Sequence, residues 1–372
     1  MKFFLEYLLA ADKIAIELEK TVNKRDRTNI SEIESIQLLK NHYLLSLFGN
    51  KNISNNRWST AFQIIQKIAE VDTSIAHLLG YHFLVSSQIL YRGKNNTQID
   101  LFENMINKQS FFGNSSNPLS NTLYGRRSED GFIINGYKTF STGSQVADYL
   151  LVSWQDEDDD NVFFNAFIPI LRKGIKVMND WDGFGQKQTG SGTVTFDNVK
   201  INPTELLIAD KNHISSMLSQ CILFNIYTGA AIGALNKAKE YIETNNKKTN
   251  DILFRNAGKL YTKVESLKLV VKHTNTLMDD LWNKNYTLTD SERGEFGISI
   301  LEAISLSTEV SIEVVNKMFE IMGARSATNS LGYDRIWRNI RTLTLHSSLD
   351  IKYAHLGKFY LTGIYPEKGY YS

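Results

Sequence analysis

Apolar residues recur at three- and four-residue spacing through the first hundred positions of the chain. The runs 61–69 and 75–79 place their apolar side chains on one face of a helix. Between them, the triplet 72–74 reads Asp-Thr-Ser, residue types that favour a helix N-terminus. The pattern predicts an N-terminal helical domain over residues 1–108.

The pattern changes near Phe111 to short runs of β-branched and aromatic residues. The runs 131–136, 149–152, 162–164 and 193–196 are separated by Gly, Asn and Asp, which favour turns. Such runs predict a small antiparallel β-barrel domain over residues 109–204.

Helical spacing returns after Pro203, in the runs 230–235, 267–278 and 298–322, and the next proline is Pro366. Long helices without proline are typical of a bundle, so we expect a C-terminal four-helix bundle over residues 205–372. The fold class expected from the three parts together is α+β, with helix in excess.

Composition narrows the class of protein. The 372 residues are 42% hydrophobic and carry a formal net charge of +1, without the basic excess expected of a nucleic-acid-binding protein. Cys221 is the only cysteine, which excludes an intramolecular disulfide and fits a reducing cytoplasm. The seven histidines show no metal-ligand spacing, so we expect no metal site. We also expect no signal peptide and no membrane span, and therefore a soluble cytoplasmic protein.

The segment 335–350 carries the most specific chemical signal. It reads Arg-Ile-Trp-Arg-Asn-Ile-Arg-Thr-Leu-Thr-Leu-His-Ser-Ser-Leu-Asp. It resembles the acyl-CoA dehydrogenase run Arg-x-x-Arg-Asp-x-Arg-x-x-x-Ile-Tyr-Glu-Gly-Thr, whose Glu removes a proton from the substrate's alpha carbon. Ser347 stands in place of that Glu, and a hydroxyl with a pKa far above neutrality cannot serve as the base. Leu223 occupies the alternative base position, six residues before Gly229, and cannot serve either.

Two further segments resemble the same superfamily. The run 136–144, Gly-Tyr-Lys-Thr-Phe-Ser-Thr-Gly-Ser, is similar to the stretch that lies against the flavin, and the run 183–199 is similar to the strand that closes the β-domain. Departures from the dehydrogenase pattern resemble the flavin-dependent monooxygenase branch, typified by dibenzothiophene monooxygenase. They lie in the runs 344–346, 113–119 and 189–192.

This resemblance implies a two-component monooxygenase that uses reduced FMN and O2 to oxygenate a small organosulfur or amine substrate. FMN is favoured over FAD because the run 245–249 lacks the Arg-x-x-Phe-Gly pattern with which dehydrogenases grip the FAD pyrophosphate. No Gly-x-Gly-x-x-Gly follows a predicted strand, so reduced flavin is expected from a separate flavin reductase. The resemblance also implies a homotetramer that assembles through the C-terminal bundle.

Two histidines are the catalytic candidates. His346 lies in the Thr-Leu-His ending, which approaches the flavin in the resemblance. His82 lies on an apolar helix, where related monooxygenases carry an active-site histidine. His77 is five positions earlier, so on a regular helix it is expected to point elsewhere. Neutral imidazoles suit oxygen chemistry because they donate hydrogen bonds without a fixed charge.

Phe140, Ser141 and Thr142 are expected to contact the flavin, with the aromatic ring over one face and the Thr142 hydroxyl near the reactive nitrogen. Asn114 and Asn117, on the loop that enters the β-domain, carry amides that suit the flavin or bound oxygen.

The phosphate of FMN requires cationic or backbone N–H donors. The candidates are Lys187 together with Arg338 or Arg341.

Two alternatives remain open at the level of the sequence. One is an acyl-CoA dehydrogenase with FAD and a relocated catalytic base. The other is a non-catalytic family member that serves as an assembly subunit and holds no flavin.

Overall fold

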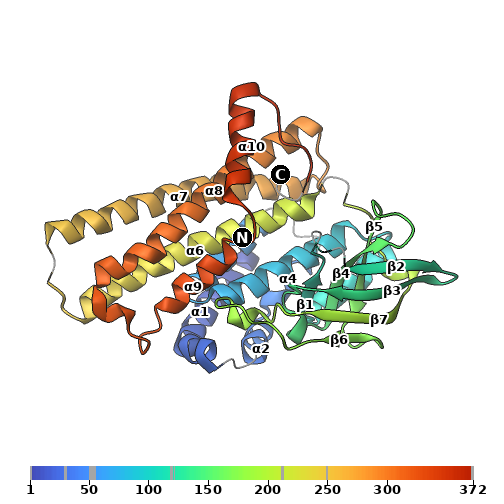
Figure 1. Ribbon diagram of the computed structural model, residues 1–372, viewed down its shortest axis with the longest axis horizontal. Helices are drawn as coiled ribbons and strands as arrows, with labels where there is room; N and C mark the ends of the chain where they lie inside the picture. The colour runs from blue at the N-terminus through green and yellow to red at the C-terminus, as the bar shows by residue number, and fades with distance from the viewer. Residues whose placement is uncertain are drawn as a thin grey trace.

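The computed structural model describes residues 2–28, 32–49, 56–117, 120, 122–210, 213–248 and 250–369. Helices precede the sheet, as the spacing predicts (Figure 1). They are α1 (Lys2–Thr28), α2 (Ile33–Asn41), η1 (Leu44–Ser46), α3 (Arg57–Ala69), α4 (Thr73–Tyr91) and α5 (Asn96–Asn107).

Helix α4 runs through the middle of the molecule, and all its residues from Thr73 to Leu90 are buried. The predicted cap is confirmed, because the Asp72 carboxylate accepts hydrogen bonds from the backbone N–H groups of Ser74 (3.0 Å) and Ile75 (3.2 Å). Helix α4 is therefore surrounded by other parts of the protein, and a polar side chain on it needs a hydrogen-bond partner.

In the described residues the sheet has seven strands. They are β1 (Phe112–Ser115), β2 (Leu123–Ser128), β3 (Gly131–Lys138), β4 (Tyr149–Asp156), β5 (Phe163–Pro169), β6 (Ile175–Val177) and β7 (Val194–Ile201). Of these, β3, β4, β5 and β7 match the four predicted runs, and β1, β2 and β6 were not predicted. The order is β1-β4-β2-β3-β7-β6, with β5 paired to β4, and the strands curl beside the N-terminal helices (Figure 1). The expectation of a purely antiparallel sheet is corrected, since β4 runs parallel to both β1 and β2. Alternating residues predict a strand but not its partner.

Three long helices follow the sheet, α6 (Ile214–Thr244), α7 (Asp251–Asn283) and α8 (Asp290–Met322). Two shorter ones, α9 (Asp334–Leu343) and α10 (Leu349–Thr362), complete the C-terminal part. Short 3₁₀ turns lie at Ser144–Val146 (η2), Lys187–Thr189 (η3), Pro203–Glu205 (η4) and Ala324–Ala327 (η5).

Helix α6 is long and apolar enough to cross a membrane by length and composition, which the sequence expectation overlooked. In the structure 89% of its apolar window is buried, so it forms the core of the fold. Gly229 and Gly233 let α6 approach α3 closely, because a Cβ at either position would clash with the backbone carbonyl of Gln66 or Glu70.

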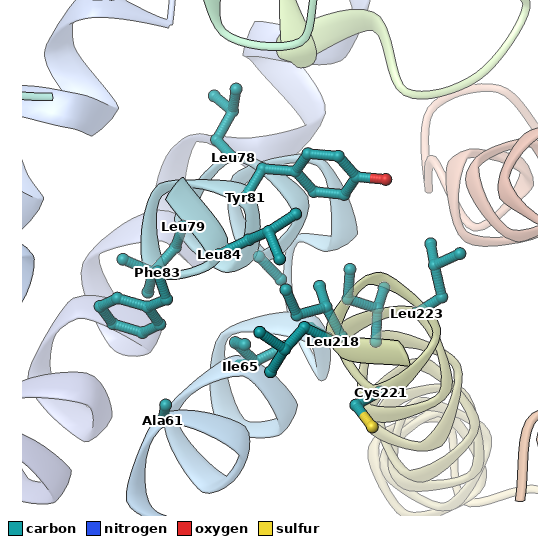
Figure 2. Close-up of a cluster of buried hydrophobic side chains, with 14 of the residues drawn as sticks. Ala61, Ile65, Leu78, Leu79, Tyr81, Phe83, Leu84, Leu218, Cys221 and Leu223 are labelled. Atoms are coloured by element: carbon teal, nitrogen blue, oxygen red, sulfur yellow. The ribbon is translucent and has the colours of Figure 1, made fainter. Parts of the chain in front are cut away.

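The core where α3, α4 and α6 meet is aliphatic and aromatic (Figure 2). Ile65, Leu79 and Leu218 lie in it, fully buried. Tyr81 extends from the same part of α4, but its hydroxyl points away from these side chains (Figure 2). That hydroxyl lies in the candidate site described below.

Candidate active site

One face of α4 presents two polar aromatic side chains. His77 and Tyr81 are one helical turn apart, and their rings meet edge to face with centroids 4.7 Å apart. Both are buried. The Tyr81 hydroxyl lies 3.2 Å from Ser219 Oγ on α6 and 3.4 Å from His346 Nε2 in the connection between α9 and α10. Three segments distant in sequence thus meet at Tyr81.

The connection that carries His346 is held in place by α6. The Tyr227 hydroxyl donates a 2.9 Å hydrogen bond to the Leu343 carbonyl, and the His346 backbone N–H donates to the same carbonyl at 3.0 Å. These bonds hold the connection so that His346 lies beside Tyr81.

Both histidines of this cluster are neutral at neutral pH. Burial lowers the pKa of His77 to about 3, with a further contribution from His346. Burial also lowers the pKa of His346 to about 4, and the charge of Lys352 adds to that effect. Burial is the largest cause of the lowered pKa at both histidines. The cluster can exchange hydrogen bonds and protons without holding a fixed negative charge.

The two ring nitrogens of His77 differ in their hydrogen bonding. Nδ1 lies 3.4 Å from Gln186 Oε1, which can only accept, so we assign the proton to Nδ1. Gln186 is itself oriented by Thr73 Oγ1, to which its Nε2 donates at 3.0 Å. Among the described residues His77 Nε2 has no hydrogen-bond partner. An imidazole nitrogen is thereby left for a ligand.

His82, the other histidine singled out from the sequence, has a different environment. Its Nε2 donates to the Leu45 carbonyl at 2.9 Å, and its Nδ1 accepts from the Phe112 backbone N–H at 3.2 Å. The ring also stacks on Phe111. Both nitrogens are occupied by backbone groups, which argues against catalysis by His82 and for a structural role. His77, set aside because it lies five positions before His82, shares its helix face with Tyr81 at i, i+4 spacing, a signal that the sequence analysis did not use.

The β-domain supplies the loop 140–142. Phe140 has a left-handed backbone (φ 53°), is 63% exposed, and meets Trp181 edge to face at 5.9 Å. Thr142 Oγ1 lies 3.1 Å from Ser191 Oγ. A residue with a strained backbone and an exposed aromatic ring is more typical of a ligand site than of a hydrophobic core.

Ser141 and Asn114 anchor this loop to β1. Ser141 is fully buried, and its Oγ accepts from Ser115 Oγ at 2.8 Å. The Asn114 backbone N–H donates to the Thr142 carbonyl at 3.0 Å. Asn114 Oδ1 accepts from Ser116 Oγ, which leaves the donor capacity of its amide nitrogen outside this bond.

Lys138 is a residue that the sequence reading missed. It is buried, and its Nζ donates to the carbonyls of Asn117 (3.1 Å) and Ser120 (2.6 Å). Burial lowers the pKa of Lys138 to about 8. The Asn117 backbone is thus tied to the end of β3, which leads into the loop 140–142.

Lys187 and Arg338 line one cavity of about 410 Å³, walled by α1, η3 and the start of α9. Arg338 donates to Asp26 Oδ2 at 2.5 Å, to Asp334 Oδ2 at 2.8 Å and to the Phe184 carbonyl at 2.7 Å. Two carboxylates already neutralise this guanidinium, which argues against its use for a phosphate. Lys187 pairs with no carboxylate among the described residues.

Comparisons with known proteins show which families the chain resembles over most of its length. The family model for the acyl-CoA dehydrogenase middle domain matches residues 113–199, and the model for the C-terminal domain matches residues 223–351. The probable FMNH2-dependent monooxygenase SfnC of Pseudomonas putida is 30% identical over 387 residues, which cover 98% of this chain and 97% of SfnC.

Two solved structures are similar over almost the full length. The methanesulfinate monooxygenase MsuC from Pseudomonas fluorescens superposes with a TM-score of 0.94 at 29% identity, covering 98% of this chain and 99% of MsuC. FMN-bound TdsC, the dibenzothiophene monooxygenase from Paenibacillus sp. A11-2, gives a TM-score of 0.91 at 28% identity and covers 98% of this chain and 100% of TdsC.

Proposed function

The chain belongs to the acyl-CoA dehydrogenase superfamily, in its flavin-dependent monooxygenase branch, and we propose that it is a two-component monooxygenase. It uses reduced FMN and O2 to oxygenate a small organosulfur or amine substrate. The observation that carries the proposal is the buried, neutral cluster of His77, Tyr81 and His346, located where dehydrogenases hold a carboxylate.

The residues present fit FMN. Phe140 offers an exposed aromatic face, Thr142 a hydroxyl, and Asn114 an amide donor, while Ser141 fixes the loop from below. When bound, the reduced flavin supplies the electrons that activate dioxygen. Asn117 and Lys187 complete the proposed flavin-binding set, with Lys187 directed to the phosphate in place of Arg338.

The catalytic roles fall to His346 and, in place of His82, to His77. His77 Nε2 is open to a ligand, and the Tyr81 hydroxyl lies between Ser219 and His346. The Tyr81 hydroxyl can therefore pass a proton between Ser219 and His346, and His77 Nε2 is left to hydrogen-bond the reacting atoms. Burial of the cluster excludes water, which protects a reactive oxygen species from loss.

The test is aerobic turnover of the purified protein with FMN, a flavin reductase, NADH and a set of organosulfur and amine candidates. The expected result is a product heavier by one oxygen atom in the mass spectrum. Anaerobic reduction of bound flavin by acyl-CoA substrates would instead establish the dehydrogenase alternative, and failure to bind any flavin would establish the non-catalytic one.

The proposal includes a separate flavin reductase, a cytoplasmic location and a homotetramer. Support for assembly comes from large apolar side chains that α7 and α10 expose on the surface. They include Ile252, Phe254, Tyr261, Leu269, Tyr360 and Leu361.

A further inference from the structure

Lys352 is a buried cation at an unfavourable position in its helix. It lies in the first turn of α10 and is 2% exposed. The N-terminus of a helix carries a partial positive charge, so a cation in the first turn is not stabilised by the helix dipole. Among the described residues no carboxylate forms an ion pair with it, and burial lowers the pKa of Lys352 to about 8. The stability of α10 therefore does not explain a lysine at this position.

The Lys352 ammonium group instead binds the connection between α9 and α10. Its Nζ donates to the Ser347 hydroxyl and, at 3.5 Å, to the Ser347 carbonyl. At the other end of the connection the Tyr227 hydroxyl donates to the Leu343 carbonyl at 2.9 Å. His346 lies between Leu343 and Ser347, so side chains of α6 and α10 hold the backbone on both sides of it.

The contact that this backbone places is a long one. His346 Nε2 lies 3.4 Å from the Tyr81 hydroxyl, near the upper limit for a hydrogen bond. A displacement of the connection by about 0.5 Å away from α4 would break it. The geometry of the cluster therefore depends on how firmly the connection is held.

We propose that Lys352 is a positioning residue for the oxygenation, because its ammonium group holds Ser347 and thereby directs His346 at the Tyr81 hydroxyl. The inference rests on the proposed monooxygenase function and adds a residue to it. Lys352 acts through His346, so its loss should disturb the histidine without removing a group that touches flavin or substrate.

The charge of Lys352 gives this role a measurable signature. Burial lowers the pKa of His346 to about 4, and the charge of Lys352 adds to that effect. Because residue 347 is a serine, it binds the ammonium group without neutralising it. The His346 ring should therefore respond to any change in the charge at position 352.

Other helices also bring titratable groups close to the connection. From α4, the Tyr81 hydroxyl contacts the His346 ring, and the neighbouring His77 is neutral at neutral pH. From α9, the cationic Arg341 donates to Thr344 Oγ1 at 3.4 Å, two residues before His346. Arg341 therefore offers a matched control, since it is a second cation that binds the same connection by a side-chain contact.

Deuterium exchange at the histidine C2 position, read by mass spectrometry of peptides from the FMN-free full chain, gives the pKa of each histidine. We expect His346 to titrate well below about 6.5 in the unaltered protein. Lys352→Met should raise the pKa of His346 by about one pH unit, whereas Lys352→Arg and Arg341→Met should leave it within about half a pH unit. His82, on the buried helix α4, should keep its pKa in every variant.

Ser347→Asp tests the same charge without altering Lys352. A carboxylate at this position would pair with Lys352 and cancel its effect on the ring, so the pKa of His346 should rise by about one pH unit or more. Ser347→Asn is the matched neutral substitution. It keeps a polar partner for Lys352 and should leave the pKa of His346 within about half a pH unit.

Turnover with FMN, a flavin reductase and NADH measures the effect on the reaction, using a candidate that the unaltered protein oxygenates. Lys352→Met should lower kcat by about tenfold or more, because a displaced catalytic group is costly, and should leave FMN affinity within about threefold. Lys352→Arg should recover most of the loss. Lys173→Met removes an exposed lysine of the β-domain and should change nothing. Circular dichroism checks that each variant folds.

The inference is wrong if Lys352→Met leaves the pKa of His346 unchanged, or if that variant folds and keeps its kcat. Should Lys352→Met fail to fold, Ser347→Asp decides through the same pKa. If His346 responds as expected but the unaltered protein oxygenates no candidate, the proposed function fails while the action of Lys352 on His346 stands. Turnover with an unresponsive His346 leaves the proposed function intact and removes Lys352 from it.

Discussion

His77 and His82 lie five positions apart on α4 and use their ring nitrogens in opposite ways. His77 leaves Nε2 open beside Tyr81, whereas His82 joins the Leu45 carbonyl to the Phe112 N–H. A single residue type on a single helix therefore offers an open ring nitrogen at one position and joins two backbone groups at the other, within the described residues.

Substitution should separate these two roles. His77→Gln is expected to lower kcat by about 10²-fold or more, the usual range for loss of a positioned acid–base group, with little change in stability. His82→Gln should instead lower the free energy of unfolding by about 1–3 kcal/mol, because buried backbone groups lose their partners. Steady-state turnover and urea denaturation measure the two effects. The reverse pattern would restore His82 as the catalytic residue.

Arg338 provides a second contrast at this scale. Because it is committed to Asp26 and Asp334, Arg338→Met should leave FMN affinity within about threefold while lowering the free energy of unfolding by roughly 1–2 kcal/mol. Lys187→Met should weaken FMN binding by about tenfold, as expected for loss of a phosphate contact. Fluorescence quenching of FMN gives both affinities. A large loss in Arg338→Met alone would reverse the assignment.

Single elements were predictable from the sequence where the signal is local. The cap at Asp72, the β-prone runs and the long proline-free helices are all written in neighbouring residues. Contacts between segments that are distant in sequence could not be predicted. One is the parallel pairing of β4 with β1, and another is the ion pair between Arg338 and Asp26, which are 312 positions apart. Helix phase separates His77 from His82 in the sequence, but it does not show which of them lies beside His346, because that depends on how α4 packs against the C-terminal helices. The catalytic role of either histidine stays a prediction. The division of the chain at residues 108 and 204 stays a prediction.

The close approach of α3 and α6 predicts that a side chain added at Gly233 lowers the stability of the protein. Gly233→Ala should lower the free energy of unfolding by about 1–3 kcal/mol, because the new methyl group meets the Glu70 backbone and one helix must move. Gly258→Ala, in α7, has open space around its Cβ and should be neutral or stabilising by up to about 1 kcal/mol. Urea denaturation compares them. Equal changes in the free energy of unfolding for the two variants would show that α6 can move away from α3 without loss of stability.

At the scale of the whole molecule, three buried histidines make stability depend on pH. Burial lowers the pKa of His77 to about 3 and those of His82 and His346 to about 4, below the unfolded value of about 6.5. Between these values the unfolded chain binds more protons than the folded one, so the free energy of unfolding falls as the pH falls from about 6.5 towards 4.

Each of these histidines contributes up to about 3 kcal/mol of that loss, at about 1.4 kcal/mol per pKa unit. His82→Gln should therefore reduce the slope of unfolding free energy against pH in this window, and His273→Gln, at an exposed site, should retain it. Urea denaturation across the pH range measures the slope. Identical slopes in all three proteins would show that His82 is as accessible to protons in the folded state as in the unfolded chain.

Helices α7 and α10 expose large apolar side chains, which bear on how the protein assembles. Helix α7 runs along an edge of the molecule away from the sheet, and α10 projects beside it (Figure 1). Leu269 on α7 is 72% exposed and Leu361 on α10 is 80% exposed. Exposed apolar surface of this kind marks a contact between proteins.

We expect the purified protein to elute as a tetramer in light-scattering chromatography. Leu269→Glu combined with Leu361→Glu should shift it towards smaller species, because each copy would bury unpaired charges at the interface. Leu171→Glu alters a side chain that is 93% exposed on the β-domain and should leave the tetramer intact. A monomer in the unaltered protein would exclude the tetramer, and dissociation by Leu171→Glu alone would place the interface on the sheet instead of the C-terminal helices.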